Sequence, residues 1–177
     1  FGASWTTWAI PRMTSVAPGD IYPTVIGISP AFDADRQLFL GTRKHGVIQS
    51  FDGGHTWRAD ADVPKSALIT SLAVSPDNAQ VLFRAGANDR LEGYHNGKIF
   101  VVPAAGGAPR QVSPAAATYD VSGATWSKDG RAIYFTANMG VHDQVFRLDP
   151  ATRQAVQLTK GDHSLGGWQY VETAATF

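Results

Sequence analysis

The chain has 177 residues, of which 15 are basic, 15 are acidic and none is cysteine, together with 18 glycines and 10 prolines. This length predicts about one domain, and zero formal charge gives no general attraction to nucleic acid or to an anionic membrane surface. Without cysteine, the chain can have no disulfide, thiolate nucleophile or cysteine-type zinc site. No apolar stretch is long enough to span a bilayer, so we expect a soluble chain. Its compartment is left open, and secretion and the periplasm are among the alternatives.

The acidic residues are unevenly divided between the two types. Thirteen are Asp, and only Glu92 and Glu172 are Glu. Asp, Gly and Pro favour turns, whereas Glu and Lys favour helices. The composition therefore predicts many short strands joined by tight turns, with few helices.

Three successive segments carry the same order of signals, and each contains four short apolar runs separated by turn residues. A serine ends the first run of each segment, at Ser29, Ser75 and Ser127, so the segments repeat after 46 and 52 residues. Asp, Gly or Pro stands where each hairpin would reverse. The predicted strands, some including the turn residues that follow them, are 25–30, 38–42, 47–50 and 56–59, then 71–77, 81–85, 98–102 and 109–112, then 123–130, 132–136, 144–148 and 155–159.

Four strands in a period of about 40 to 50 residues are typical of one blade of a β-propeller. Second strands such as 132–136 lack clean alternation of apolar and polar residues, which indicates a strand covered on both faces. We therefore predict an all-β fold of propeller blades, each of four antiparallel strands, with about three and a half blades in the chain. A β-sandwich is the alternative, although its strands alternate more strictly.

The segment Ser50-Phe51-Asp52-Gly53-Gly54-His55-Thr56-Trp57 matches the pattern Ser-x-Asp-x-Gly-x-x-Trp in full. Through it, residues 1–65 resemble the Asp-box (BNR) repeats of sialidase-like and sortilin-like propellers. The expected role is structural. Asp52 would accept N–H groups across its own turn, Ser50 would close that turn, Gly54 would supply a conformation closed to other residues, and Trp57 would pack under the hairpin.

The later part of the chain resembles a different propeller. Residues 125–138, Thr-Trp-Ser-Lys-Asp-Gly-Arg-Ala-Ile-Tyr-Phe-Thr-Ala-Asn, look like a TolB-type repeat, and with 142–149 and 157–164 they are similar to the propeller of prolyl oligopeptidase family serine peptidases. Either a mosaic, natural or engineered, or divergence of one ancestral repeat explains the change. The resemblances divide the chain into five parts. Residues 1–20 are the end of a preceding Asp-box blade, and residues 21–65 are an Asp-box-type blade. Residues 66–117 and 118–163 are TolB-like blades, and residues 164–177 are the start of a further blade.

The sequence carries no complete catalytic set. It lacks the Gly-x-Ser-x-Gly elbow of a serine hydrolase. For a sialidase, Ile10-Pro11-Arg12 has the wrong order of the expected Arg-Ile-Pro motif, and Glu92 is the one candidate Glu outside the C-terminal end. The five histidines lack the spacing of a helical zinc site. We expect no catalytic residue, no metal and no cofactor.

The connections between the second and third strands of the segments contain the best candidate binding residues. Equivalent connections of a propeller lie on one face around the central channel, so these three would form a common surface. The competing interpretation is that they are ordinary solvated loops. The candidates are Arg43, His45, Arg90, Tyr94, His95, His142 and Asp143.

Both ends of the chain look like interrupted repeats, since 1–5 resembles the tail of an earlier Asp-box copy and 173–177 the start of a strand. Propellers have about four to eight blades, so we expect self-association or additional blades to close the ring. The predicted function is a non-catalytic propeller module or scaffold for protein or peptide binding or assembly, without nucleic acid or membrane partners. The alternative is part of the substrate-gating propeller of a prolyl oligopeptidase-like serine peptidase, its catalytic domain lying elsewhere.

Overall fold

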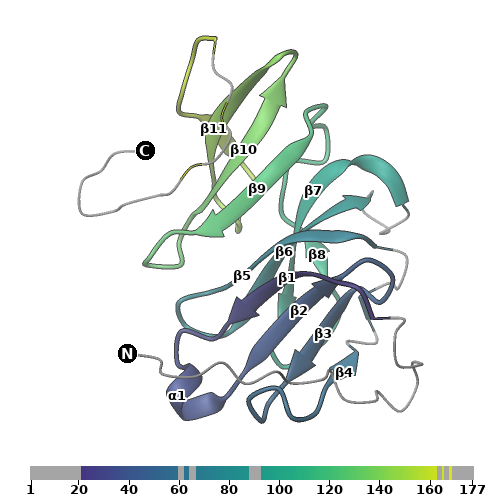
Figure 1. Ribbon diagram of the computed structural model, residues 1–177. Helices are drawn as coiled ribbons and strands as arrows, with labels where there is room; N and C mark the ends of the chain where they lie inside the picture. Colours follow the sequence, from purple (N-terminus) through teal and green to yellow (C-terminus); the bar gives the residue numbers. More distant parts are fainter. Residues whose placement is uncertain are drawn as a thin grey trace.

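The computed structural model describes residues 21–59, 62–63, 67–87, 93–162, 165 and 168. They form three four-stranded antiparallel sheets, each with its strands in chain order (Figure 1). The predicted all-β fold of four-stranded antiparallel units is confirmed. Sheet one contains β1 (Pro23–Ile28), β2 (Leu38–Thr42), β3 (Val47–Ser50) and β4 (Arg58–Ala59), sheet two β5 (Ile69–Val74), β6 (Gln80–Ala87), β7 (Gly93–Pro103) and β8 (Arg110–Gln111), and sheet three β9 (Val121–Trp126), β10 (Ile133–Met139), β11 (His142–Leu148) and β12 (Ala155–Gln157).

One short helix, α1 (Phe32–Asp35), lies between β1 and β2 in the described part of the chain. It ends at Arg36, whose φ of 55° is left-handed and whose N–H donates to the carbonyl of Phe32. This helix occupies the connection that sheets two and three make with a tight turn. Among the described residues, no helix has the length and apolar character needed to cross a membrane.

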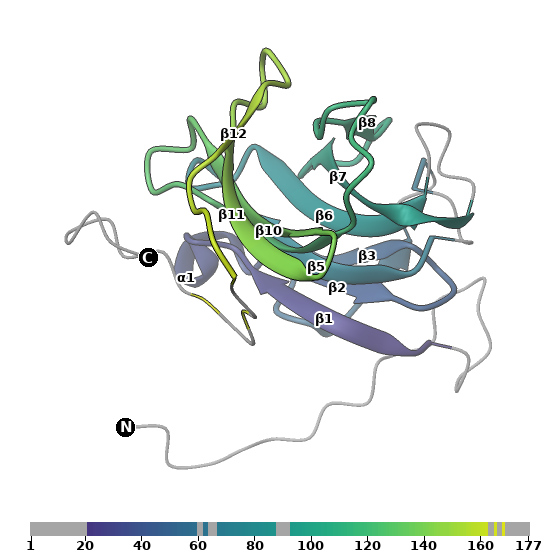
Figure 2. The ribbon, with the colours of Figure 1, turned by 90° about the horizontal axis from the view of Figure 1, so that it is seen from above.

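The sheets stack face to face, with their first strands side by side. Strand β1 packs against β5, and β5 packs against β9, so the first strands of all three sheets share one inner side. Figure 2 shows β1 and β2 of sheet one next to β5 of sheet two. This is the arrangement of consecutive propeller blades, in which the first strand lies nearest the central axis. The described residues do not close the three sheets into a ring.

Sheet two is buried on both faces because its neighbours cover both. Phe83 and Phe100, whose ring centroids are 5.4 Å apart, face sheet one and pack in a cluster with Phe39. The intervening Leu82 and Ile99 face sheet three. Apolar residues therefore occupy successive positions of β6 and β7, which is why these strands show no simple alternation.

Two glycines let sheet one approach sheet two closely. A Cβ built on Gly27 would overlap the side chain of Leu72. One built on Gly41 would lie 2.5 Å from Ile69 Cγ2 and 2.6 Å from Val25 Cγ1. Glycine at these two strand positions therefore sets the spacing between the sheets.

Candidate functional site

The predicted loop at Arg43 and His45 is present as a turn between β2 and β3. Its geometry is fixed by Thr42, whose Oγ1 accepts from the N–H of His45 at 2.8 Å and donates to the carbonyl of Gly46 at 2.9 Å. Gly46 has a φ of 63°, as a tight reversal requires. The Arg43 side chain is exposed at this end of sheet one.

The other two predicted loops are shorter than expected, and this part of the interpretation is corrected. His142 and Asp143 belong to β11, because β10 and β11 stay paired out to Met139 and His142. Only Gly140 and Val141 turn, with Gly140 at a φ of 73°. Tyr94 and His95 belong to β7 rather than to a loop, and Arg90 lies outside the described residues.

His142 and Asp143 both contact the chain that follows β12. The imidazole Nε2 of His142 lies 3.2 Å from Asp162 Oδ1. Asp143 Oδ2 accepts the backbone N–H of Leu165 at 3.2 Å. These two predicted binding residues therefore hold a neighbouring segment of the same chain against sheet three.

Sequence reasoning missed Arg84, which joins sheets two and three at the end of the stack where β6 turns into β7. Its Nε donates to the carbonyl of Val121 at 2.6 Å, Nη1 to Thr70 Oγ1 at 2.9 Å, and Nη2 to Asp120 Oδ1 at 2.9 Å. The available signal was a single charged residue inside the apolar run 81–85. Such a charge in a strand covered on both faces needs partners from the adjoining sheet.

Asp120 collects further donors at the same end. The N–H of Gly97 donates to its carboxylate, and a Cβ on Gly97 would overlap the Arg84 guanidinium. The backbone of Asp120 pairs with Asn138, accepting its N–H at 3.1 Å and donating to its Oδ1 at 2.9 Å. The ends of β6, β7 and β10 are thus tied together, and we call Arg84, Gly97, Asp120 and Asn138 the inter-sheet polar cluster.

Lys98 lies beside this cluster and is largely buried. Its Nζ donates to the carbonyl of Ala117. Burial lowers the pKa of the Lys98 ammonium, and the negative charge of Asp120 opposes that shift. The group therefore links strand β7 to the connection before β9.

Two equivalent turns at the opposite end of the stack share one hydrogen-bond pattern. In each, a buried serine Oγ donates to an aspartate Oδ1 two residues later at 2.6 Å, as in Ser75 with Asp77 and Ser127 with Asp129. The same serine oxygens accept backbone N–H groups at 2.9 Å. The serine hydroxyl lowers the pKa of each aspartate, and a backbone N–H adds to the effect. These groups close hairpins.

The turn from Ser50 to Trp57 has the same Ser–Asp pair, here between β3 and β4. Ser50 Oγ donates to Asp52 Oδ1 at 2.8 Å and accepts the N–H of Gly54 at 2.8 Å. Asp52 also accepts the hydroxyl of Thr56 at 2.6 Å and its N–H at 2.9 Å, and these bonds hold its pKa well below the usual range. The Trp57 indole donates to the carbonyl of Gly54 at 2.9 Å.

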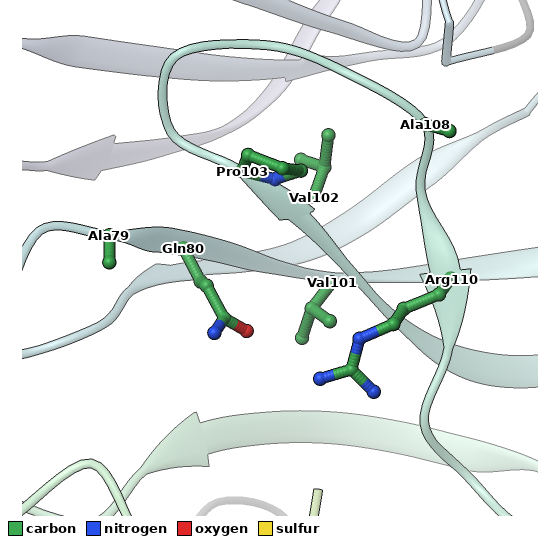
Figure 3. Close-up of a pocket in the computed structure, with 7 residues that line it drawn as sticks. All are labelled: Ala79, Gln80, Val101, Val102, Pro103, Ala108 and Arg110. Atoms are coloured by element: carbon green, nitrogen blue, oxygen red, sulfur yellow. The ribbon is translucent and has the colours of Figure 1, made fainter. Parts of the chain in front are cut away.

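A cavity of about 270 Å³ opens at this turn end of sheet two (Figure 3). The side chains of Gln80 and Arg110 lie on either side of Val101. Gln80 Oε1 is a buried acceptor without a hydrogen-bond partner among the described residues. The cavity is lined by Ala79, Gln80, Val101, Val102, Pro103, Ala108 and Arg110.

In the part of the chain that the structure describes, no group of three or more His, Cys, Asp or Glu side chains is placed to hold a metal ion. No family model and no curated protein matches the sequence.

Solved structures do match the fold. A protein assigned as TolB from Agrobacterium tumefaciens superposes with a TM-score of 0.57 and 20% identity, over 77% of this chain and 46% of its own. TolB from Acinetobacter baumannii superposes with a TM-score of 0.57 and 15% identity, over 78% of this chain and 32% of its own. A GH74 enzyme from Niastella koreensis superposes with a TM-score of 0.62 and 16% identity, over 85% of this chain and 24% of its own.

The three sheets are β-propeller blades. At identities this low, the likeness establishes only the fold. The chain spans less than half the length of each of these matched propellers. The likenesses include TolB proteins and glycoside hydrolases, so propeller architecture is what they have in common with this chain.

Proposed function

We propose that the chain is a non-catalytic β-propeller module, a scaffold for assembly and for protein or peptide binding, whose first sheet packs against another propeller sheet. The observation that carries this is the exposure of two isoleucines on an inner strand. Ile26 and Ile28 in β1 are 55% and 56% exposed, whereas Gly27 between them contacts Leu72 of sheet two.

The outward face of sheet one is partly covered already. Leu40 and Ile48 on this face are buried, and Ile21, Trp57 and Ala59 pack against them. Ile26 of β1, which pairs with Leu40, and Ile28 are by contrast more than half exposed. Two isoleucines exposed on the same face of one strand support contact with another protein surface.

Ring closure accounts for the uncovered face. A propeller has about four to eight blades, and each blade buries both faces against its neighbours, as sheet two does here. The described residues form three sheets, which is fewer than that number. In the proposed assembly a sheet from a second copy, or from additional blades, occupies the outward face of β1.

The molar mass in solution tests self-association directly. Light scattering after gel filtration, over a wide range of concentrations, should give a multiple of the 18.9 kDa chain mass. The double variant Ile26→Thr, Ile28→Thr should move the protein toward the monomer, while Val141→Thr, at a turn residue that is 90% exposed, should not. A mass of 18.9 kDa at every concentration contradicts self-association.

The end that carries the β2–β3 turn and the inter-sheet polar cluster is the proposed surface for a protein or peptide. Arg43 is exposed there, and the hydroxyl of Thr42 fixes the conformation of the turn through its hydrogen bonds to the backbone of His45 and Gly46. The peptidase alternative rests on the resemblance of residues 123–164. Under both hypotheses this chain alone should hydrolyse no peptide substrate, and measurable turnover would contradict the non-catalytic assignment.

A further inference from the structure

The cavity between Gln80 and Arg110 lies at the end of sheet two opposite the inter-sheet polar cluster, and none of the structural roles above uses it. We propose that it binds an N-acylated α-amino carboxylate with a small aliphatic side chain, the chemistry of a peptide C-terminus. This inference goes beyond the proposed scaffold, because it concerns a separate site and requires no ring closure.

The first support is an acceptor that needs a donor. Gln80 Oε1 is buried and has no partner in the described structure, although the backbone N–H of the same residue donates to Ser75 Oγ at 2.9 Å and fixes its position. A buried amide oxygen left unpaired is unfavourable, so such groups are normally satisfied by protein, water or ligand. An amide N–H of a ligand would satisfy it.

The second support is a positioned guanidinium. Arg110 Nη1 donates to the carbonyl of Pro150 at 3.1 Å, across the boundary between sheets two and three. Arg153 crosses the same boundary in the other direction, with Nη2 donating to the carbonyl of Ser113 at 3.2 Å. The bond to Pro150 orders the Arg110 side chain, and the remaining N–H groups of its planar fork suit a carboxylate.

The carboxylate of Asp149, next to Pro150, accepts hydrogen bonds from its own turn rather than from the Arg110 guanidinium. Asp149 directs its Oδ1 to the N–H groups of Ala151 and Thr152, at 2.8 and 3.1 Å, within its own turn. Arg110 therefore keeps donors for an incoming anion.

The cavity floor sets the third requirement. Val101 lies between the two polar side chains, while Pro103 lies beside Val102 and Ala108 stands at the edge (Figure 3). A volume of about 270 Å³ is below that of a typical drug-sized pocket and fits one small residue. The proposed ligand donates its amide N–H to Gln80, accepts from Arg110 with its carboxylate, and packs its side chain on Val101.

The test is an NMR titration of the full chain with N-acetyl-L-valine, the peptide acetyl-Ala-Ala-Val and N-acetyl-L-valinamide. The first two carry the free carboxylate and should shift the backbone signals of residues 101–110 and the side-chain amide of Gln80. The valinamide should bind at least about tenfold more weakly. Tighter binding of the peptide than of N-acetyl-L-valine would support a peptide terminus as the source, and equal affinity for the two would support the single N-acylated residue.

Variants separate this site from nonspecific binding. Arg110→Met and Gln80→Leu should each weaken the carboxylate probes about tenfold, and Gln80→Glu should do so through charge repulsion. The matched control is Arg131→Met, which removes another arginine at the same end, with a side chain that is 86% exposed. Equal binding of the valinamide, unchanged affinity in folded Gln80→Leu or Arg110→Met, or no shift with millimolar carboxylate probes would overturn the proposal.

Discussion

Arg84 of sheet two and Asp120 at the start of sheet three form an ion pair of 2.9 Å in which the arginine side chain is only 17% exposed. The same guanidinium also bonds to Thr70 and to the carbonyl of Val121. The two blades are therefore joined by a polar contact as well as by their apolar cores. Because its partners come from both sheets, the pair forms only when the sheets are correctly aligned.

Removing the acceptor from this pair should destabilise the protein. Asp120→Ala deprives Arg84 of one partner and leaves the N–H of Gly97 unpaired, so the free energy of unfolding should fall by about 1–3 kcal/mol. The control is Arg131→Ala, which breaks a 4.0 Å pair with Asp129 between exposed side chains and should cost less than about 0.5 kcal/mol. Urea unfolding measures both, and equal effects would contradict a role in joining blades.

A methyl group at Gly41 should separate sheets one and two. Gly41→Ala would place its Cβ within 2.6 Å of both Ile69 and Val25, so overpacking should cost about 1–3 kcal/mol. Gly123→Ala is the matched control in sheet three, because the nearest atom to its Cβ, Thr136 Oγ1, is 3.9 Å away. Thermal unfolding should therefore show a clear loss for the first variant and little change for the second.

The turn aspartates should make the fold acid-sensitive. Hydrogen bonds lower the pKa of Asp52, Asp77, Asp129 and Asp149 from the ordinary value of 3.8. Their folded-state pKa values are below the unfolded ones, so their stabilisation is full above about pH 4 and is lost as pH falls through the folded values. Urea midpoints between pH 7 and pH 2 should decline below pH 4.

Replacing three of these four aspartates with asparagine, and keeping Asp52, removes three of the titrating groups. In the variant Asp77→Asn, Asp129→Asn, Asp149→Asn the decline below pH 4 should be shallower than in the wild type. The same slope in both proteins would mean that other carboxyl groups cause the acid sensitivity.

The Ser50 turn should depend on both members of its pair. Ser50→Ala removes the donor to Asp52 and the acceptor for Gly54 at a residue that is 1% exposed, and should cost about 1 kcal/mol or more. Asp52→Ala should also lower the melting temperature, because the Thr56 donors lose their acceptor. Unchanged melting of both variants would refute the structural role that the Asp-box resemblance implies.

Local signals predicted the strands well because a hairpin is encoded by nearby residues. The serine and aspartate that close the β5–β6 and β9–β10 turns lie two positions apart, and the apolar runs beside them are contiguous in sequence. The long predicted loop before His142 was wrong for a related reason. How far two strands stay paired depends on register, which the pairing of Met139 with His142 determines and composition does not show.

The sequence by itself determined the repeat, the four-stranded antiparallel unit and the turn chemistry, since each depends on residues close together in the chain. Only the tertiary structure decided which residues meet between units. Arg84 reaches Asp120 across 36 positions and Arg110 reaches Pro150 across 40. Those meetings depend on how one sheet lies against the next, so they are invisible in the strand pattern. The apolar face left exposed on β1 became visible for the same reason, because exposure belongs to the stack of blades rather than to one blade.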